Sequence, residues 1–150
     1  FKDDRLVARH MGGFQRWLVA SPELLARHPV KHPSDLANVH CLTFRGDRPG
    51  ATWRFKSPQG ETNVEVTGQI AVRSFGVLLQ LALAGQGFAF LPSFMVEEEL
   101  KAGRLVRCFS QFQSPEAQVY LTFRPGTRRI ARAAAVIEAA EELVPRLLAS

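Results

Sequence analysis

The sequence has little cysteine, no long apolar run and no leader-like start. Only two cysteines occur in 150 residues, neither in a C-x-x-C pair, so no disulfide framework is expected and a reducing compartment, the cytoplasm, fits best. No run of about 18 apolar residues exists, which argues against a membrane-spanning helix. No charged segment followed by an apolar stretch opens the chain, so no secretion signal is visible.

Charge is not concentrated in any one region either. The net charge is +5, with eleven basic against seven acidic side chains in residues 1–75 and eight against seven in residues 76–150. The densest cluster, Arg128, Arg129 and Arg132, is too short for a nucleic-acid-binding arm, and no helix-turn-helix, zinc-finger or RNP motif is present. Direct DNA binding by these residues is therefore not expected.

Candidate metal ligands are few. His28 and His32 have a four-residue spacing, but Pro29 and Pro33 interrupt the helix that would align them. With Cys41 nearby a zinc site is conceivable, but the spacing matches no recognised ligand set. Polar loop histidines are the preferred interpretation, and no metal or cofactor is predicted.

Short apolar runs alternate with helix-start signals along the chain. Strands are expected at 17–20, 41–44, 69–72, 88–91, 105–109 and 119–123, with a hairpin of strands 52–55 and 62–66 around the turn 57–60. Helices are expected directly after Ser21-Pro22 and Pro33, then at 74–85, 92–103 and 127–149. This alternation predicts an α/β fold with a mostly parallel sheet flanked by helices.

The last predicted helix has one apolar face. Its members are Ile130, Ala133, Ala134, Ile137, Ala140, Val144, Leu147 and Leu148. The opposite side carries Glu138, Glu141 and Glu142, which are expected to face solvent.

Three strand-to-helix joints share one design, with a hydroxyl and unpaired backbone N–H groups at a helix start. The hydroxyls belong to Ser21, Ser74 and Ser93. If these joints face one crevice, they hold the oxygens of a carboxylate or phosphate, and Arg73 adds a charge. Phe75 and Phe94 then line its apolar wall. The alternative is that each serine only caps its helix and both rings belong to the core.

Enzyme motifs are missing. No G-x-S-x-G sequence occurs, and all four histidines lie before residue 41 without a recognisable carboxylate partner. The segment 85–87 (GQG) precedes a strand, whereas nucleotide-binding glycines follow one. An enzyme is not predicted; a small hydrolase using Ser21 or Ser74 is the minor alternative.

Three segments give the chain a family resemblance. They are LVARHMGGFQRWLVASPELLARHP (6–29), HPSDLANVHCLTF (32–44) and VTGQIAVRSFGVLLQLALAGQGFAFLPSFMVEEELKAGRLVRCF (66–109). The chain resembles the effector-binding domain of LysR-type transcriptional regulators over nearly its whole length, most strongly at 6–109.

This resemblance implies a type 2 periplasmic-binding-protein-like fold, with two α/β lobes around a ligand cleft. Residues 12–117 would form a nearly complete lobe two, and residues 1–11 and 118–150 a partial lobe one. In such regulators DNA is bound by an N-terminal winged helix-turn-helix, which these residues do not include, and the proteins form homodimers or homotetramers.

The resemblance also points to a site for a small-molecule effector, expected to be anionic. It places Arg73, Ser74 and Phe75, and the stretch Leu91, Pro92 and Ser93, at the ligand cleft; the common Asn-Asp pair is replaced here by Ser74-Phe75. The implied function is effector sensing for a transcription factor. The alternative is a solute-binding domain of transport type, which the pI of 9.9 and the absent leader disfavour.

Overall fold

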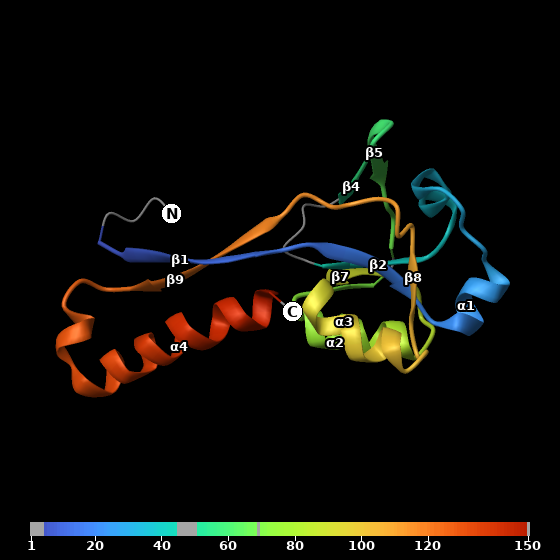
Figure 1. Cartoon of the computed structure of the whole chain (residues 1–150). Coiled ribbons are helices and arrows are strands. Elements are labelled where there is room, and N and C mark those ends of the chain that lie inside the picture. The colour runs from blue at the N-terminus through green and yellow to red at the C-terminus, as the bar shows by residue number, and fades with distance from the viewer. Residues whose placement is uncertain (1–4, 45–50, 69, 150) are drawn as a thin grey trace. The chain divides into compact units, whose positions relative to one another are not determined.

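A computed structural model describes residues 5–44, 51–68 and 70–149 (Figure 1). The chain forms two compact units. Unit 1 comprises residues 1–14 and 116–150, and unit 2 comprises residues 15–115. These boundaries lie two to three residues from the lobe boundaries predicted from the resemblance.

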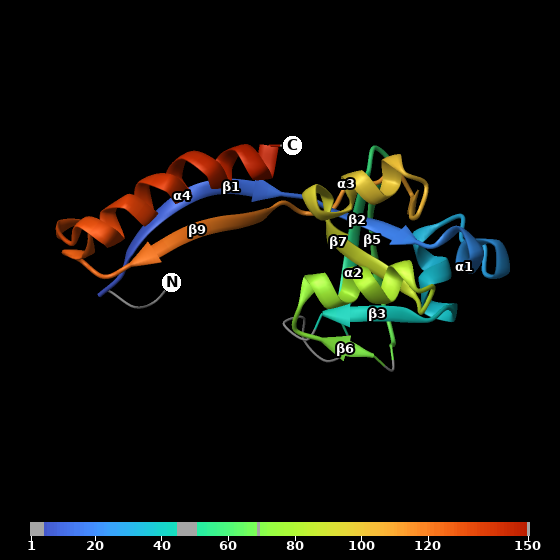
Figure 2. The same cartoon turned by 90° about the horizontal axis from the view of Figure 1, so that it is seen from below.

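Unit 1 is built on two antiparallel strands, β1 (Val7–Phe14) and β9 (Ala117–Phe123), followed by the 3-10 turn η2 (Thr127–Arg129) and α4 (Ala131–Ala149). Helix α4 runs along the strands (Figure 2), with Ile137 and Met11 buried between them. Only part of the predicted apolar face is used, because Ile130 and Leu147 are exposed.

Unit 2 holds a five-stranded sheet in the order β6-β3-β7-β2-β8. The strands are β2 (Arg16–Ala20), β3 (Cys41–Phe44), β6 (Ala71–Val72), β7 (Phe88–Pro92) and β8 (Val106–Cys108). Strand β3 is parallel to β6 and β7, but β2 is antiparallel to both of its neighbours. The sheet is therefore mixed: β6, β3, β7 and β8 run in one direction, as a mostly parallel sheet requires, and β2 alone runs in the other. A short apolar run such as WLVA forms a strand in either direction, so the reversal of β2 was not visible in the sequence.

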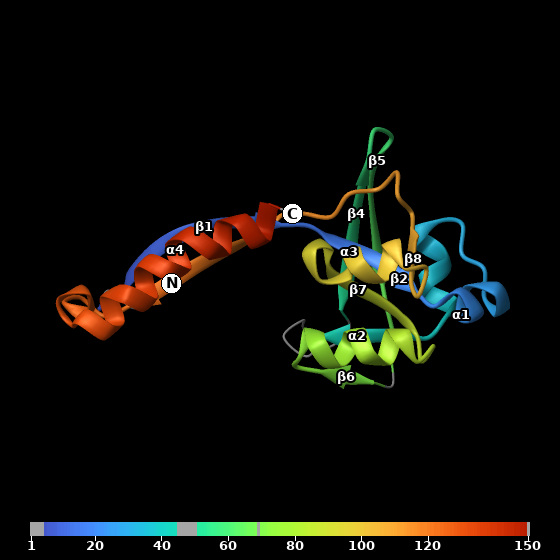
Figure 3. The same ribbon diagram turned by 60° about the horizontal axis from the view of Figure 1, so that its bottom comes forward.

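Both faces of this sheet are covered. One face packs on α2 (Phe75–Leu83) and α3 (Ser93–Lys101), through a core that includes Val19, Ala89 and Leu91. The other face receives Leu18 and Phe90 and is covered by hairpin β4 (Thr52–Ser57) and β5 (Gly60–Glu65), α1 (Pro22–Arg27) and η1 (Pro33–Asn38). The hairpin projects beyond the sheet (Figure 3). Successive side chains of β2 and β7 thus pack alternately into two separate cores, one on each face of the sheet.

The helix starts follow the predicted signals in most places. Ser74 Oγ accepts a hydrogen bond from the Val77 N–H at 3.3 Å and caps α2. Segment η1 is a 3-10 helix, whose start is closed by Asp35 accepting hydrogen bonds from the backbone N–H groups of Lys31 and His32. These two N–H groups lower the pKa of the Asp35 carboxyl.

His28 and His32 also have structural positions. His28 is the C-cap residue of α1, and His32 is the N-cap residue of η1. In the described ranges, no three His, Cys, Asp or Glu side chains are close enough together to hold a metal ion. Within those same ranges, no helix has both the length and the apolar character to cross a membrane.

Candidate functional site

Because of the strand directions in unit 2, a helix start, two arginines and two aromatic rings lie at one edge of the sheet. Strands β3, β6 and β7 end there, at Phe44, Val72 and Pro92. Strand β2 starts there, because Arg16 pairs with Pro92 in the antiparallel register. We call this the carboxyl edge of unit 2; open α/β sheets commonly bind ligands at such an edge.

Helix α2 begins at this edge. Its N-cap residue Ser74 and the preceding Arg73 are exposed, and the half-buried Phe75 ring stacks on Phe44, with 4.3 Å between centroids and 11° between planes. Arg73, Ser74 and Phe75 therefore lie at the carboxyl edge together with the ring of Phe44. The pair presents an aromatic surface beside a helix start.

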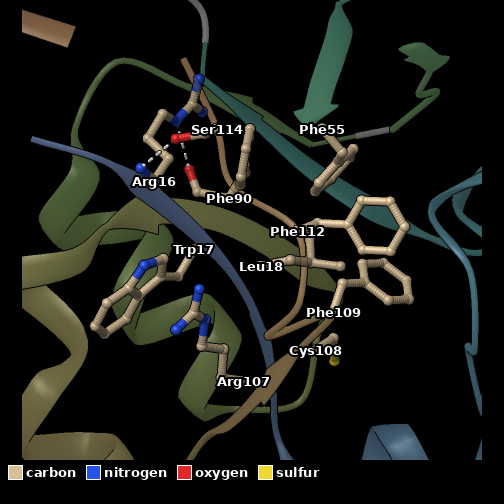
Figure 4. Close-up of a pocket in the computed structure, with 10 residues that line it drawn as sticks. All are labelled: Arg16, Trp17, Leu18, Phe55, Phe90, Arg107, Cys108, Phe109, Phe112 and Ser114. Atoms are coloured by element: carbon tan, nitrogen blue, oxygen red, sulfur yellow. Dashed lines mark hydrogen bonds between the residues drawn. The ribbon is translucent and has the colours of Figure 1, made fainter. Parts of the chain in front are cut away.

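Arg16 supplies a fixed positive charge at the same edge. Its Nε donates a hydrogen bond to the Phe90 carbonyl oxygen at 2.9 Å, and its backbone N–H donates to Ser114 Oγ at 2.8 Å (Figure 4). The guanidinium carbon lies 4.6 Å from the centroid of the Phe90 ring and 5.9 Å from that of Phe75. Sequence reasoning missed Arg16, because its place depends on the reversed direction of β2.

The predicted contribution of Leu91, Pro92 and Ser93 is largely structural. All three are buried, and Leu91 belongs to the core beneath α2 and α3. The N-cap residue of α3 is Pro92, which makes no side-chain capping hydrogen bond, and the Ser93 N–H donates to the Gln15 carbonyl oxygen at 2.8 Å. Ser93 lies at the carboxyl edge, but only 8% of its surface is exposed. Phe94, in the first turn of α3, is half-buried.

Ser21 lies at the opposite edge of the sheet. It follows the end of β2, which runs against β7, and it is 1% exposed. Its Oγ accepts a hydrogen bond from the Leu24 N–H at 3.2 Å, and it approaches Gly85 ahead of β7. The three serine joints therefore do not share one edge, and Ser21 acts as a buried helix cap.

A second group of residues surrounds a small internal hollow of unit 2 (Figure 4). Its lining includes Arg16, Trp17, Phe90, Arg107 and Cys108. The volume, about 10 Å³, is close to that needed for one water molecule and too small for an organic ligand. The Arg107 guanidinium carbon lies 4.2 Å from the Trp17 ring centroid, so this arginine packs on the indole.

Both cysteine thiols are expected to react slowly in the folded protein. Burial raises the pKa of Cys41 to about 12 and that of Cys108 to about 11, from an ordinary value of 9.0, so both stay protonated at pH 8. Alkylation by iodoacetamide at pH 8 should be slow in buffer and fast in urea. Equal rates in both would contradict the burial of the thiols.

The same shifts predict how stability varies with pH. Unfolded thiols ionise near pH 9, whereas the folded thiols keep their protons until about pH 11 to 12. The free energy of unfolding should therefore fall as the pH rises above 9. Urea titrations at pH 7 and pH 10 measure this decrease in the free energy of unfolding. The decrease between the two pH values should be smaller in Cys41→Ala and in Cys108→Ala than in the unsubstituted protein.

Comparisons with known proteins agree on one family. A family model described as the LysR substrate binding domain matches residues 1–145. The HTH-type transcriptional regulator DmlR of Escherichia coli is 32% identical over 112 residues, covering 73% of this chain and 36% of the relative. The HTH-type transcriptional regulator PtxR of Pseudomonas aeruginosa is 30% identical over 146 residues, covering 97% and 47%. The chain thus spans about half or less of these relatives.

Solved structures show the same similarity. The regulatory domain of CrgA, a LysR-type transcriptional regulator from Neisseria meningitidis, has a TM-score of 0.80 at 26% identity, covering 96% of this chain and 72% of that one. The full-length Vibrio cholerae virulence activator AphB has a TM-score of 0.78 at 25% identity, covering 92% and 47%. All of these relatives are regulators of transcription, which disfavours the transport alternative.

Proposed function

Because the chain belongs to the LysR substrate-binding domain family of transcriptional regulators, we propose that it senses a small anionic effector at the carboxyl edge of unit 2. The site would consist of Arg16, Arg73, Ser74 and the stacked rings of Phe44 and Phe75. The placement of Arg16 carries the proposal. The Arg16 guanidinium, which is always charged, lies beside the start of α2 and beside the aromatic surface of Phe44 and Phe75.

The chemistry of these groups favours a carboxylate ligand with a flat or apolar body. A guanidinium and a helix start both stabilise negative oxygens, and Phe44 with Phe75 offers a face for the rest of the molecule. Leu91 and Pro92 support this edge from within the core, and Ser93 borders it. Ser21 takes no part, because it lies at the other edge of the sheet.

The proposed mechanism is a shift between conformations and involves no chemical transformation of the effector. An effector that prefers one arrangement of the regulator changes the populations by its difference in affinity. In the whole regulator, which would act in the cytoplasm as a homodimer or homotetramer, DNA would be bound by the N-terminal winged helix-turn-helix of the family. The expected output is therefore altered promoter binding.

A thermal-shift screen with aliphatic and aromatic carboxylates tests this site. A ligand present at 100 times its Kd should raise the free energy of unfolding by about 2.7 kcal/mol. Arg16→Met should weaken its affinity by about 10-fold to 100-fold, because a charge-assisted hydrogen bond contributes about 1.5–3 kcal/mol. For each variant, the ligand-induced shift is measured from that variant's own ligand-free melting temperature. A change in stability caused by losing the hydrogen bond from Arg16 to the Phe90 carbonyl oxygen then does not affect the comparison.

Arg54→Met is the matched control, since Arg54 is an exposed arginine on hairpin strand β4. It should leave the affinity unchanged, whereas Ser74→Ala should weaken binding by a smaller factor than Arg16→Met. Unchanged affinity in both Arg16→Met and Ser74→Ala would show that the site lies elsewhere. If the chain hydrolysed an ester and Ser74→Ala abolished this activity, the hydrolase alternative would be favoured. Salt-dependent DNA binding by the chain alone would contradict the proposal that another domain of the regulator binds DNA.

A further inference from the structure

Two aromatic rings border the Arg16 guanidinium at the carboxyl edge of unit 2. The guanidinium carbon lies 4.6 Å from the centroid of the Phe90 ring (Figure 4) and 5.9 Å from that of the Phe75 ring. Phe75 in turn stacks on Phe44, which holds the ring in place. The positive charge of the proposed site and its aromatic surface are therefore close neighbours.

This short separation determines which part of a bound carboxylate meets the aromatic surface. Charge-assisted hydrogen bonds of about 2.8 Å between a guanidinium and a carboxylate set the two central carbon atoms roughly 4 Å apart. The next atom of the ligand, the α carbon that carries the carboxylate, is then expected to lie within van der Waals range of the Phe75 ring. Groups attached to the α carbon therefore contact this ring, and the more distant part of the ligand extends beyond it.

The surroundings of Arg16 provide few partners for a polar group on the α carbon. The Phe90 carbonyl oxygen already accepts the hydrogen bond from Arg16 Nε, and Ser74 Oγ caps α2. Neither Asp nor Glu occurs in the described residues that flank this edge, which are 15–17, 43–44, 71–76 and 91–95. A hydroxyl on the α carbon would lose its water without replacement, and an ammonium would lie beside an arginine with no carboxylate to neutralise it.

We infer that the effector is a carboxylate whose α carbon carries neither a hydroxyl nor an amino group, and that Phe75 sets this preference. The preference presupposes the proposed function, because it concerns the same site. Arenecarboxylates and arylacetates fit this description. Their planar ring can pack on the Phe44–Phe75 pair in the offset or edge-to-face geometry that aromatic rings prefer. Hydroxy acids and amino acids are disfavoured by the cost of the unpaired polar group.

Three ligands that differ only at the α carbon test this preference. They are phenylacetate, mandelate, which adds a hydroxyl, and phenylglycine, which adds an ammonium. Isothermal titration calorimetry with the full chain measures the Kd of each. Phenylacetate should bind at least about 10-fold more tightly than the other two, the factor expected when one polar group is left without a partner. Mandelate or phenylglycine binding as tightly as phenylacetate, or no binding of phenylacetate at about 10 mM, would overturn the inference.

Two substitutions test the role of Phe75. Phe75→Asn places an amide beside the α carbon, so the preference for phenylacetate over mandelate should fall to about 3-fold or less. Phe75→Leu is the matched control, because it keeps an apolar side chain and should keep the preference while binding phenylacetate more weakly. Circular dichroism checks that both variants fold, and the comparison of the three ligands needs no substitution. An unchanged preference in Phe75→Asn would show that another residue sets it.

Arg16→Met separates failure of this inference from failure of the proposed function. If all three ligands bind equally and Arg16→Met weakens the binding of each, the site is correct and the preference at the α carbon is wrong. If phenylacetate binds selectively but Arg16→Met leaves its Kd unchanged, the ligand binds elsewhere. The proposed site and the role of Phe75 are then both wrong.

Discussion

Replacing Phe90 with alanine should lower the free energy of unfolding of unit 2 by about 3–5 kcal/mol. Phe90 lies on the central strand β7 and is buried between the sheet and the hairpin. Its ring centroid lies 5.3 Å from that of Trp53 and 5.1 Å from that of Phe55. The substitution would leave a cavity lined by two aromatic rings, and it would also remove the ring beneath the Arg16 guanidinium.

Urea unfolding followed by tryptophan fluorescence measures this loss, because both tryptophans, Trp17 and Trp53, lie in unit 2. Phe112→Ala is the matched control. It removes the same side chain from a half-buried position at the border of the same core and should cost less than half as much. Equal losses for Phe90→Ala and Phe112→Ala would show that the core is not centred on β7.

Replacing Gly68 with alanine should destabilise unit 2 by about 3 kcal/mol or more, at the upper end of overpacking effects. A Cβ atom at Gly68 would lie 1.9 Å from the carbonyl oxygen of Cys41. The contact involves the backbone of β3, which pairs with both β6 and β7, so no side-chain rotation relieves it. The strand itself would have to move.

Gly103→Ala provides the comparison. Gly103 has a φ of +75° with nothing within 4 Å of an added Cβ, so alanine there costs only the left-handed backbone conformation, about 1–2 kcal/mol. Urea titration of both variants separates the two causes. A loss at Gly68 no larger than that at Gly103 would contradict the close approach of the segment at Gly68 to β3.

Local signals predicted most elements of unit 2 because their causes are local. Ser74 caps α2 as expected, Gly103 ends α3 with a positive φ, and the strand predicted at 41–44 is β3. Of the strand predicted at 69–72, the structure shows only Ala71–Val72 as β6; Ile70 is not part of the strand, and Gln69 lies outside the described residues. Such caps, turns and apolar runs depend on neighbours within a few residues.

The features of the fold that were not predicted depend on pairings between residues far apart in the sequence. Strand β1 was not predicted from its pattern, because the alternation of VARHMGGF is weakened by two glycines and by an irregularity between His10 and Gly12. Because of the reversed direction of β2, Ser21 lies at the opposite edge of the sheet and Arg16 lies at the carboxyl edge. On α4, the predicted apolar face includes Ile137, which is buried, but also Ile130 and Leu147, which are exposed, because a helical period alone does not show how much of a face is covered.

The hydrogen bond between the Arg16 backbone N–H and Ser114 Oγ joins the first strand of unit 2 to its last segment, so this unit begins and ends at neighbouring points in space. Phe14 and Ala117 are likewise paired partners in β1 and β9. Unit 2 is therefore inserted into unit 1 like a cassette. The two points at which the chain passes between the units, after Phe14 and before Glu116, therefore lie at one end of the β1–β9 ladder.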